Sequence, residues 1–339
     1  MKYNRLGNTG IKVSQLCLGT MTFGAEADEK ECSKIYAAAK DKGINIFDCA
    51  NLYAGGNSEK ILGKLIKSHR EEVVLTTKAY FPVDSYAGGG AISWGRGLNR
   101  THLIRALDDS LKRLNTDYID IYYMHRFDDD CSLEESLSTL NDFVHQGKIN
   151  YIGLSNFAAW QYMKAVGITK MHNYAPIACI QPMYNLLKRQ CESEILPMAI
   201  SENVGVFSYS PLAGGVLTGK YVTKNKDKVD GRLNEMEMYK VRYGAKHIDN
   251  IAENFVNFAN KNGFDPISLA IAWTLHHPAI SAPIIGGRSA EQLKASLNAV
   301  DIEMSIELRE KISNLSNAPE TATDRSEETT SYIEKILIL

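Results

Sequence analysis

The sequence lacks the features that mark several classes of protein. None of its six cysteines stands in a CxxC pair, so neither a zinc site nor a disulfide framework is indicated. The 38 Lys and Arg residues nearly balance the 40 Asp and Glu residues, which gives a net charge of −2 and no basic surface for nucleic acid. The first residues contain no apolar signal region, and no apolar run approaches the roughly 20 residues of a membrane-spanning helix. These absences predict a cytoplasmic protein with reduced thiols and no metal, whose partners include neither a membrane nor a nucleic acid.

The chain also lacks a segment with the composition of a linker between domains. Its hydrophobic content of 44% and charged content of 23% are those of an ordinary globular protein with an ample core. A chain of 339 residues holds either two ordinary domains or one α/β barrel, which needs roughly 250 residues. We expect a single domain over residues 1–317 and a polar C-terminal tail over 318–339 that ends in an amphipathic segment.

Helical and strand patterns alternate along the chain from residue 27 onward. Cys32, Ile35, Tyr36 and Ala39 lie at i, i+3, i+4 and i+7, the spacing of an amphipathic helix. Further along, Ser132-x-x-Glu135 has the sequence of a capping box at the start of a helix. Eight strand-like runs alternate with such helices, at residues 16–19, 44–48, 73–78, 119–125, 149–155, 177–181, 204–210 and 281–287.

This alternation predicts the fold. Sustained alternation of strand and helix indicates a parallel sheet, and eight units favour a closed (β/α)₈ TIM barrel over an open sheet. No GxGxxG follows an early strand, which argues against a Rossmann domain. Two short runs around Asn8-Thr9-Gly10 predict an N-terminal β-hairpin at the bottom of the barrel. The connections Tyr80–Asn99, after the third strand, and Pro211–His247, after the seventh, are long enough to be functional or disordered loops.

Four of the strand-like runs stop at residues that are capable of chemistry. These residues are Asp48, Lys78, His125 and the Ser155-Asn156 pair. Ionisable groups at the end of an apolar strand are costly unless they are paired or used. In a (β/α)₈ barrel the carboxyl ends of the strands gather on one face, where active sites lie. We therefore expect the functional site at this face, with Tyr53 close to Asp48.

The residue types at these strand ends predict acid catalysis. An opposite charge shifts a pKa by roughly 1–3 units, so Lys78 is expected to lower the pKa of Tyr53 from about 10 and make it a proton donor near neutral pH. Asp48 would keep Lys78 charged, and His125 would donate a hydrogen bond to a substrate oxygen. This set protonates a carbonyl oxygen and contains no nucleophile. It favours carbonyl reduction by an external hydride over hydrolysis.

The motifs that carry these residues resemble those of the aldo-keto reductases over nearly the whole chain. G-x-N-x-F-D-x-A-x-x-Y at residues 43–53, TTK ending at Lys78 and DYIDIYYMH at residues 117–125 are similar to the segments that carry the catalytic tetrad of that family. GKINYIGLSN at 147–156, CIQPMYN around Gln181, SYSPLAGGVLTGKY at 208–221 and PIIGGRSAEQL at 283–293 are similar to its cofactor-binding segments. Each motif alone is a weak signal, whereas all of them in the family's order are a strong one.

The resemblance implies a role for each matching residue. Tyr53 would be the general acid, Asp48 and Lys78 would tune it, and His125 would orient the carbonyl of a small-molecule substrate. The implied cofactor is NADP(H), with Ser155, Asn156 and Gln181 at the nicotinamide carboxamide, Tyr209 on the ring, and Arg288 at a 2′-phosphate. The residues that the resemblance places near the cofactor are Gly19, Thr20, Met21, Asp48, Ser155, Asn156, Gln181, Tyr209, Ser210, Pro211, Leu212, Gly214, Lys220, Gly286, Arg288, Gln292 and Ser296.

The chain departs from the family's pattern at three positions, and several alternatives stay open. Cys49 stands where the family often has threonine or serine, Gly287 replaces a common alanine, and Ser296 stands where many members have an asparagine at the adenine. The plain alternative for Asp48 and Lys78 is a structural ion pair. At the level of function, the alternative is a nicotinamide-binding regulatory subunit that resembles the β subunits of potassium channels. The physiological substrate, the direction of reaction and the oligomeric state are left open.

Individual side chains also have plain interpretations. Without its motif His125 would be interpreted as a core histidine, and Tyr209 as a core aromatic residue. Arg288 could equally be a solvated surface residue. The adjacent His276 and His277 precede a proline and favour a helix C-terminus over a metal site. Trp94, in the loop after the third strand, fits loop packing as well as substrate contact.

Overall fold

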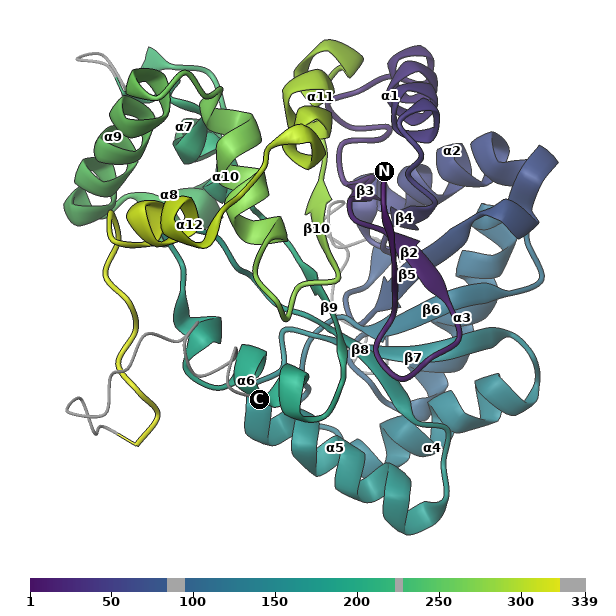
Figure 1. Cartoon of the computed structure of the whole chain (residues 1–339). Helices are drawn as coiled ribbons and strands as arrows, with labels where there is room; N and C mark the ends of the chain where they lie inside the picture. The colour runs from purple at the N-terminus through teal and green to yellow at the C-terminus, as the bar shows by residue number, and fades with distance from the viewer. Residues whose placement is uncertain (84–94, 223–227, 324–339) are drawn as a thin grey trace.

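Eight parallel strands form a closed barrel in the computed structural model, which describes residues 1–83, 95–222 and 228–323. The order of the strands around the barrel is β10-β3-β4-β5-β6-β7-β8-β9, so every neighbour along the chain is a neighbour in space (Figure 1). The predicted (β/α)₈ barrel is therefore confirmed. The strands are β3 (Cys17–Gly19), β4 (Ile46–Asp48), β5 (Val74–Ala79), β6 (Ile119–Met124), β7 (Ile149–Ser155), β8 (Ile177–Gln181), β9 (Gly205–Ser208) and β10 (Ala282–Ile285).

Helices surround the barrel and cover its outer face (Figure 1). The stripe Cys32, Ile35, Tyr36 and Ala39 is buried on the first of them, as its spacing predicts. The α-helices are α1 (Glu29–Asp41), α2 (Asn57–Ile66), α3 (Arg100–Leu114), α4 (Leu133–His145), α5 (Ala159–His172), α6 (Ile195–Ser201), α7 (Arg232–Glu235), α8 (Glu237–Tyr243), α9 (Lys246–Lys261), α10 (Pro266–Leu275), α11 (Ala290–Leu297) and α12 (Ile306–Ser313). Short 3₁₀ turns are η1 (Tyr53–Gly56), η2 (Lys67–Glu72), η4 (Gln190–Glu192), η5 (Ala213–Thr218) and η7 (Asn298–Asp301).

The predicted capping box at the start of α4 is only half formed. Ser132 Oγ accepts a hydrogen bond from the backbone N–H of Glu135 at 3.4 Å, as in a capping box. The Glu135 carboxylate, however, accepts a bond of 2.8 Å from the backbone N–H of Arg100, at the start of the neighbouring α3. A tertiary contact has therefore taken the place of the local one.

The N-terminal hairpin closes the bottom of the barrel, as predicted. Its strands β1 (Tyr3–Arg5) and β2 (Lys12–Ser14) pair antiparallel. Leu6 and Val13 are fully buried and belong to a compact apolar cluster with inward-facing residues of the barrel strands. A Cβ at Gly205 would collide with the Leu6 side chain, so this glycine at the start of β9 allows the hairpin to approach.

The two long connections differ in what the structure shows. Most of the segment after β5, including Trp94, lies outside the described residues. Its end is anchored, because the Asp128 carboxylate accepts a bond of 2.7 Å from the backbone N–H of Leu98. The segment after β9 is not a plain loop, because η5, α7 and α8 lie within it.

The chain after α12 is described only as far as residue 323. Ser193 Oγ donates a bond of 2.9 Å to the Glu320 carbonyl, which ties the start of this segment to the barrel domain. The predicted amphipathic segment at the C-terminus lies outside the described residues. The boundary at residue 317 therefore stays a prediction.

Candidate active site

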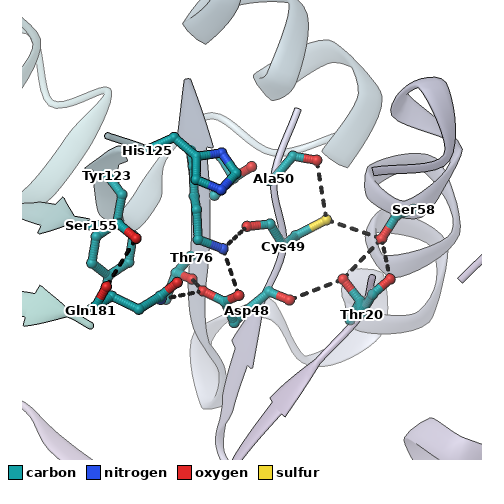
Figure 2. A network of polar contacts seen from close by, with 12 residues as sticks. Thr20, Asp48, Cys49, Ala50, Ser58, Thr76, Tyr123, His125, Ser155 and Gln181 are labelled. Atoms are coloured by element: carbon teal, nitrogen blue, oxygen red, sulfur yellow. Dashed lines mark hydrogen bonds and ion pairs between the residues drawn. The ribbon is translucent and has the colours of Figure 1, made fainter. Parts of the chain in front are cut away.

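The strand-end residues gather at the carboxyl ends of the barrel strands. Asp48 is the last residue of β4, and Lys78 lies one residue before the end of β5. His125 follows β6 directly, and Gln181 is the last residue of β8. Figure 2 shows Asp48 beside Thr76 and Gln181, with His125 nearby. The face predicted for the site is therefore the face at which these side chains meet.

Asp48 and Lys78 form a buried ion pair in which every contact is short. Lys78 Nζ lies 2.5 Å from Asp48 Oδ2 and donates a second bond of 2.6 Å to the Cys49 carbonyl. The Lys78 side chain is 0% exposed. Burial alone would lower the pKa of Lys78, but the Asp48 carboxylate outweighs it, and the net pKa is raised above its ordinary value. Lys78 is therefore a permanent cation at the floor of the site.

The second carboxylate oxygen of Asp48 is also engaged. Asp48 Oδ1 accepts bonds from Thr76 Oγ1 at 2.8 Å and from Gln181 Nε2 at 2.9 Å (Figure 2). Thr76 is not among the residues inferred from the sequence, although the spacing of residues along a strand could have identified it. It lies two residues before Lys78 on the same strand, and side chains two apart share a face of a strand. The ion pair is thus held in place by hydrogen bonds with Thr76, Gln181 and the Cys49 carbonyl.

Tyr53 lies above this ion pair at the start of η1. The turn that carries it is unusual, because Ala54 and Gly55 both have positive φ angles, of 49° and 60°. The Lys78 ammonium lies 5.1 Å from the centroid of the Tyr53 ring. The His125 ring meets it edge to face, with the two centroids 6.3 Å apart. All four residues predicted to form the catalytic set are therefore neighbours.

The predicted lowering of the Tyr53 pKa is wrong in direction. Burial raises the pKa of Tyr53 to about 12, and the opposing charge of Lys78 does not cancel the rise. Asp48 adds to the rise, because its carboxylate disfavours a second anion close by. The expectation counted the positive charge of Lys78 but neither the burial of the phenol nor the opposing charge of Asp48. Tyr53 therefore keeps its proton at neutral pH.

His125 is a neutral imidazole at neutral pH. Burial, assisted by the charge of Lys78, holds its pKa well below the ordinary value. Its Nδ1 atom is buried and has no hydrogen-bond partner among the described residues. The Phe81 ring packs against it with centroids 5.4 Å apart. A neutral imidazole in this position has one N–H to donate.

The residues expected at the nicotinamide form one hydrogen-bonded group. Ser155 Oγ donates to the Gln181 carbonyl at 3.0 Å, and Asn156 Nδ2 donates to Ser155 Oγ at 3.1 Å and to the His125 carbonyl at 2.9 Å. Tyr209 donates to Asn156 Oδ1 at 2.6 Å. The structure thus brings this predicted set together beside the catalytic group.

The residues expected from the first strand divide into two kinds. Gly19 lies against β10, where an added Cβ would come within 2.7 Å of Ile284. Thr20 is fully buried, and its hydroxyl donates to the Asp48 carbonyl at 3.0 Å. Ser58 donates to the same hydroxyl at 2.9 Å (Figure 2). Thr20 therefore supports the backbone of Asp48, whereas the half-buried Met21 is accessible at the mouth.

The residues expected from the connection after β9 lie around η5. Ser210 and Gly214 both have positive φ angles, of 61° and 67°. Pro211 is buried and Leu212 is half-buried. Lys220 is exposed, and its Nζ donates to the Asp230 carbonyl at 3.2 Å. The connection thus presents backbone at its tight turns and one cation at its end.

The residues expected at the adenosine end follow β10. Gly286 is exposed, and Gln292 Oε1 accepts a bond of 3.0 Å from the backbone N–H of Arg288. The Arg288 guanidinium lies 2.9 Å from the carboxylate of Glu235. Ser296 is only 1% exposed on α11, which leaves it little surface for the expected contact with adenine. Arg288 is therefore the side chain of this group that is placed to bind an anion.

A second buried ion pair behind the site was not predicted. Glu59 is fully buried on α2 and accepts bonds of 2.6 Å from Thr77 Oγ1 and from Arg113 Nε. An added Cβ at Gly56, in the turn of Tyr53, would come within 2.8 Å of Arg113 Cδ. The pair therefore supports the Tyr53 turn and the outer face of β5. An acid in the first turn of a helix is ordinary, so the sequence gives no signal for its burial.

Metal-binding clusters and membrane-spanning helices are both absent from the part of the chain that the structure describes. Residues 1–83, 95–222 and 228–323 contain no group of three or more His, Cys, Asp or Glu side chains placed to hold a metal ion. The helices within the same ranges include none with the length and apolar character needed to cross a bilayer.

Comparison with known proteins agrees with the geometry. Residues 15–317 match the model of the aldo/keto reductase family. An uncharacterized oxidoreductase of Bacillus subtilis, YrpG, is 37% identical over 327 residues, which cover 94% of this chain and 97% of that protein. A versiconal hemiacetal acetate reductase of Aspergillus parasiticus is 32% identical, over 91% of this chain and 94% of that protein. A probable voltage-gated potassium channel subunit beta of Arabidopsis thaliana is 34% identical, over 89% of this chain and 92% of that protein. The chain belongs to the aldo/keto reductase family.

Proposed function

We propose that this protein reduces an aldehyde or ketone to an alcohol by hydride transfer from NADPH, with Tyr53 as the general acid. The observation that carries the proposal is the placement of the Tyr53 phenol over the buried Lys78–Asp48 pair and beside a neutral His125. A phenol, an ammonium and an imidazole in this arrangement serve a carbonyl oxygen that gains negative charge. The set contains no nucleophile for acyl transfer.

Tyr53 supplies the proton in this proposal. Its raised pKa keeps the phenol protonated at neutral pH, so the proton is available for transfer in every catalytic cycle. When negative charge develops on the substrate oxygen, that oxygen becomes more basic than phenolate, and the proton moves from Tyr53 to it. The Lys78 ammonium then stabilises the phenolate that remains. This stabilisation is greatest in the transition state, where it accelerates the reaction.

Asp48 keeps the cation in place. Without its partner, a buried lysine would lose its proton, because burial disfavours the charged form. Thr76 and Gln181 fix the carboxylate in turn, so the ion pair does not reorganise during the reaction. A preorganised group of this kind is the main source of electrostatic catalysis.

His125 orients the substrate in this proposal. Because its pKa is lowered well below the ordinary value, it is a neutral donor and does not compete with Tyr53 as an acid. The Phe81 ring beside it makes the wall of the site apolar. A carbonyl between Tyr53 and His125 would thus accept two hydrogen bonds.

The residues present fit a nicotinamide dinucleotide. Ser155, Asn156 and Gln181 offer amide and hydroxyl groups beside the catalytic set, and these would hold the carboxamide. The Arg288 guanidinium already contacts an anion, the Glu235 carboxylate, which shows that an anionic group fits against it. When bound, NADPH supplies the hydride. An arginine at this end favours a 2′-phosphate, so we propose NADP(H) over NAD(H).

The substrate class, the reverse reaction and the cellular compartment are also proposed. The substrate would be a small carbonyl compound, and alcohol oxidation would use the same residues in reverse. All six cysteines are free, as expected for a protein of a reducing compartment such as the cytoplasm.

A regulatory subunit is the second candidate. Relatives from Arabidopsis thaliana and Oryza sativa are named probable voltage-gated potassium channel subunits beta, and their similarity spans 89% of this chain. A complete catalytic set does not separate the two candidates, because a cofactor-sensing subunit can retain it.

Turnover separates the two functions. Purified protein would be mixed with NADPH and an excess of a reactive aldehyde, and the loss of NADPH absorbance would be followed beyond one equivalent. We expect steady multiple turnover that the Tyr53→Phe variant lacks. A single burst of one equivalent, with no further consumption, would favour the regulatory subunit.

A further inference from the structure

Arg288 and Glu235 join two different connections at the mouth of the barrel. Arg288 lies between β10 and α11, and Glu235 is the last residue of α7, in the connection after β9. Arg288 Nη2 lies 2.9 Å from Glu235 Oε2, and the two side chains are 33% and 46% exposed. Within the described residues, Glu235 is the single carboxylate that pairs with this guanidinium. The arginine that the proposed function assigns to a 2′-phosphate is thus already paired.

The fold holds Glu235 in this place. Leu233, two residues earlier, is buried, and its backbone N–H donates to the Tyr221 hydroxyl at 3.2 Å. On the same short helix, Arg232 Nη2 lies 3.7 Å from the carboxylate of Glu26, in the connection after β3. Arg288 lowers the pKa of Glu235, so the carboxylate is charged at neutral pH. Glu235 is therefore an anchored anion.

A carboxylate and a phosphate compete for one guanidinium. Both present two oxygen atoms that an arginine binds through paired N–H groups, and two anions on the same edge of the guanidinium repel each other. A cofactor with a 2′-phosphate must displace Glu235 or bind against its charge. A cofactor with a 2′-hydroxyl meets neither obstacle.

We propose that Glu235 is a specificity-determining residue that competes with the 2′-phosphate of NADP(H) for Arg288. It thereby reduces the preference of the protein for NADP(H) over NAD(H). The proposal rests on the proposed function, because it assumes that Arg288 faces the 2′-phosphate. Binding of NADP(H) releases Glu235 and with it the end of α7 from the β10–α11 turn. Binding of NAD(H) leaves the Arg288–Glu235 pair intact.

The test compares cofactor affinities of the native protein and the Glu235→Gln variant, measured by quenching of intrinsic fluorescence at low ionic strength. Glutamine keeps the size of the side chain and removes its charge. We expect NADPH to bind about threefold to tenfold more tightly to the variant, since the pair is partly exposed and its charge is only partly screened. NADH affinity should stay within about twofold. Adenosine 2′,5′-bisphosphate and adenosine 5′-monophosphate, as fragments, should reproduce this difference.

Glu237→Gln is the matched control. Glu237 is an exposed carboxylate two residues away, whose partner is Lys240 at 4.0 Å, and it does not contact Arg288. The Glu237→Gln substitution changes the net charge by the same amount as Glu235→Gln. Because Glu237 does not contact Arg288, this control should leave the NADPH and NADH affinities unaltered. Equal tightening by both variants would overturn the proposal, because it would show a general effect of charge.

A double-mutant cycle with Arg288→Ala separates this proposal from the proposed function. If Glu235 acts through Arg288, Glu235→Gln should have no effect on NADPH affinity in the Arg288→Ala background. A selective loss of NADPH affinity in Arg288→Ala, with no gain in Glu235→Gln, overturns the role of Glu235 and leaves the proposed function standing. Equal losses of NADPH and NADH in Arg288→Ala overturn both the assignment of Arg288 and the role of Glu235.

Discussion

Gln181 Nε2 donates a hydrogen bond of 2.9 Å to Asp48 Oδ1. The two residues end β8 and β4, which are not neighbours in the barrel, so the bond crosses its mouth. Because Asp48 also pairs with Lys78, the amide of Gln181 belongs to the electrostatic support of Tyr53. Any ligand that binds Gln181 therefore touches the network that holds the proton donor.

Tyr53→Phe should remove nearly all reductase activity while cofactor still binds. The phenol supplies the proton, and general acid catalysis contributes roughly 10²–10⁴-fold. Steady-state kcat and NADPH affinity would both be measured. Tyr174→Phe, in a tyrosine that stacks on His172 at the end of α5, is the control and should keep full activity. A Tyr53→Phe variant that retains more than about a tenth of kcat would contradict the assignment.

The rate of reduction should be flat over a wide range of pH. Tyr53 must be protonated to donate, and because burial raises its pKa to about 12, activity is lost only as the pH rises towards that value. Oxidation of the matching alcohol needs the phenolate, so it should increase with pH by up to about tenfold per unit. Both profiles would be measured on the chemical step. A fall in reduction centred near pH 8 would show that Lys78 outweighs burial.

Lys78→Met should abolish activity and destabilise the fold, because it leaves the buried carboxylate of Asp48 without its cation. Breaking a buried pair costs about 3–5 kcal/mol. Adding Asp48→Asn to this variant should restore part of the stability and none of the activity. Chemical denaturation of the two single variants and the double variant measures this coupling. Additive losses of stability would contradict a direct buried pair.

Thr76→Val and Thr77→Val form a matched pair on opposite faces of β5. Each removes one hydrogen bond to a buried carboxylate, Asp48 on the inside and Glu59 on the outside. Both should lose about 1.5–3 kcal/mol of stability, the range for a hydrogen bond to a charged group. Thr76→Val should lower kcat more than Thr77→Val does, because the partner of Thr76 pairs directly with Lys78. Equal effects on kcat would show that the inner network has no special role.

Arg288→Ala should weaken NADPH binding by about 1–3 kcal/mol and barely change NADH binding, because NADH has no phosphate at this place. The native protein should accordingly prefer NADPH. Titration of both reduced cofactors by fluorescence quenching measures this. Equal losses of NADPH and NADH affinity in the variant would contradict the assignment.

The sequence by itself determined the barrel and the set of strand-end residues. Strand and helix periods are local, so eight alternating units predict eight strands around a closed sheet. Because parallel strands place their carboxyl ends on one face, Asp48, Lys78 and His125 had to lie near one another. The stripe on α1 and the N-terminal hairpin followed from the same short-range patterns.

Only the tertiary structure decided the electrostatics of the site. Asp48 and Gln181 are 133 positions apart, and Arg288 and Glu235 are 53 apart, so no local pattern pairs them. The pKa of Tyr53 is the balance of burial, one cation and one anion, and the sequence shows none of the distances that set this balance. Glu135 shows the same at the start of α4. Its carboxylate accepts a hydrogen bond from the backbone N–H of Arg100 on the neighbouring α3, and not from the backbone N–H of Ser132 as a local capping box would require. Local periodicity places side chains on faces, whereas desolvation and charge depend on atoms brought together from distant parts of the chain.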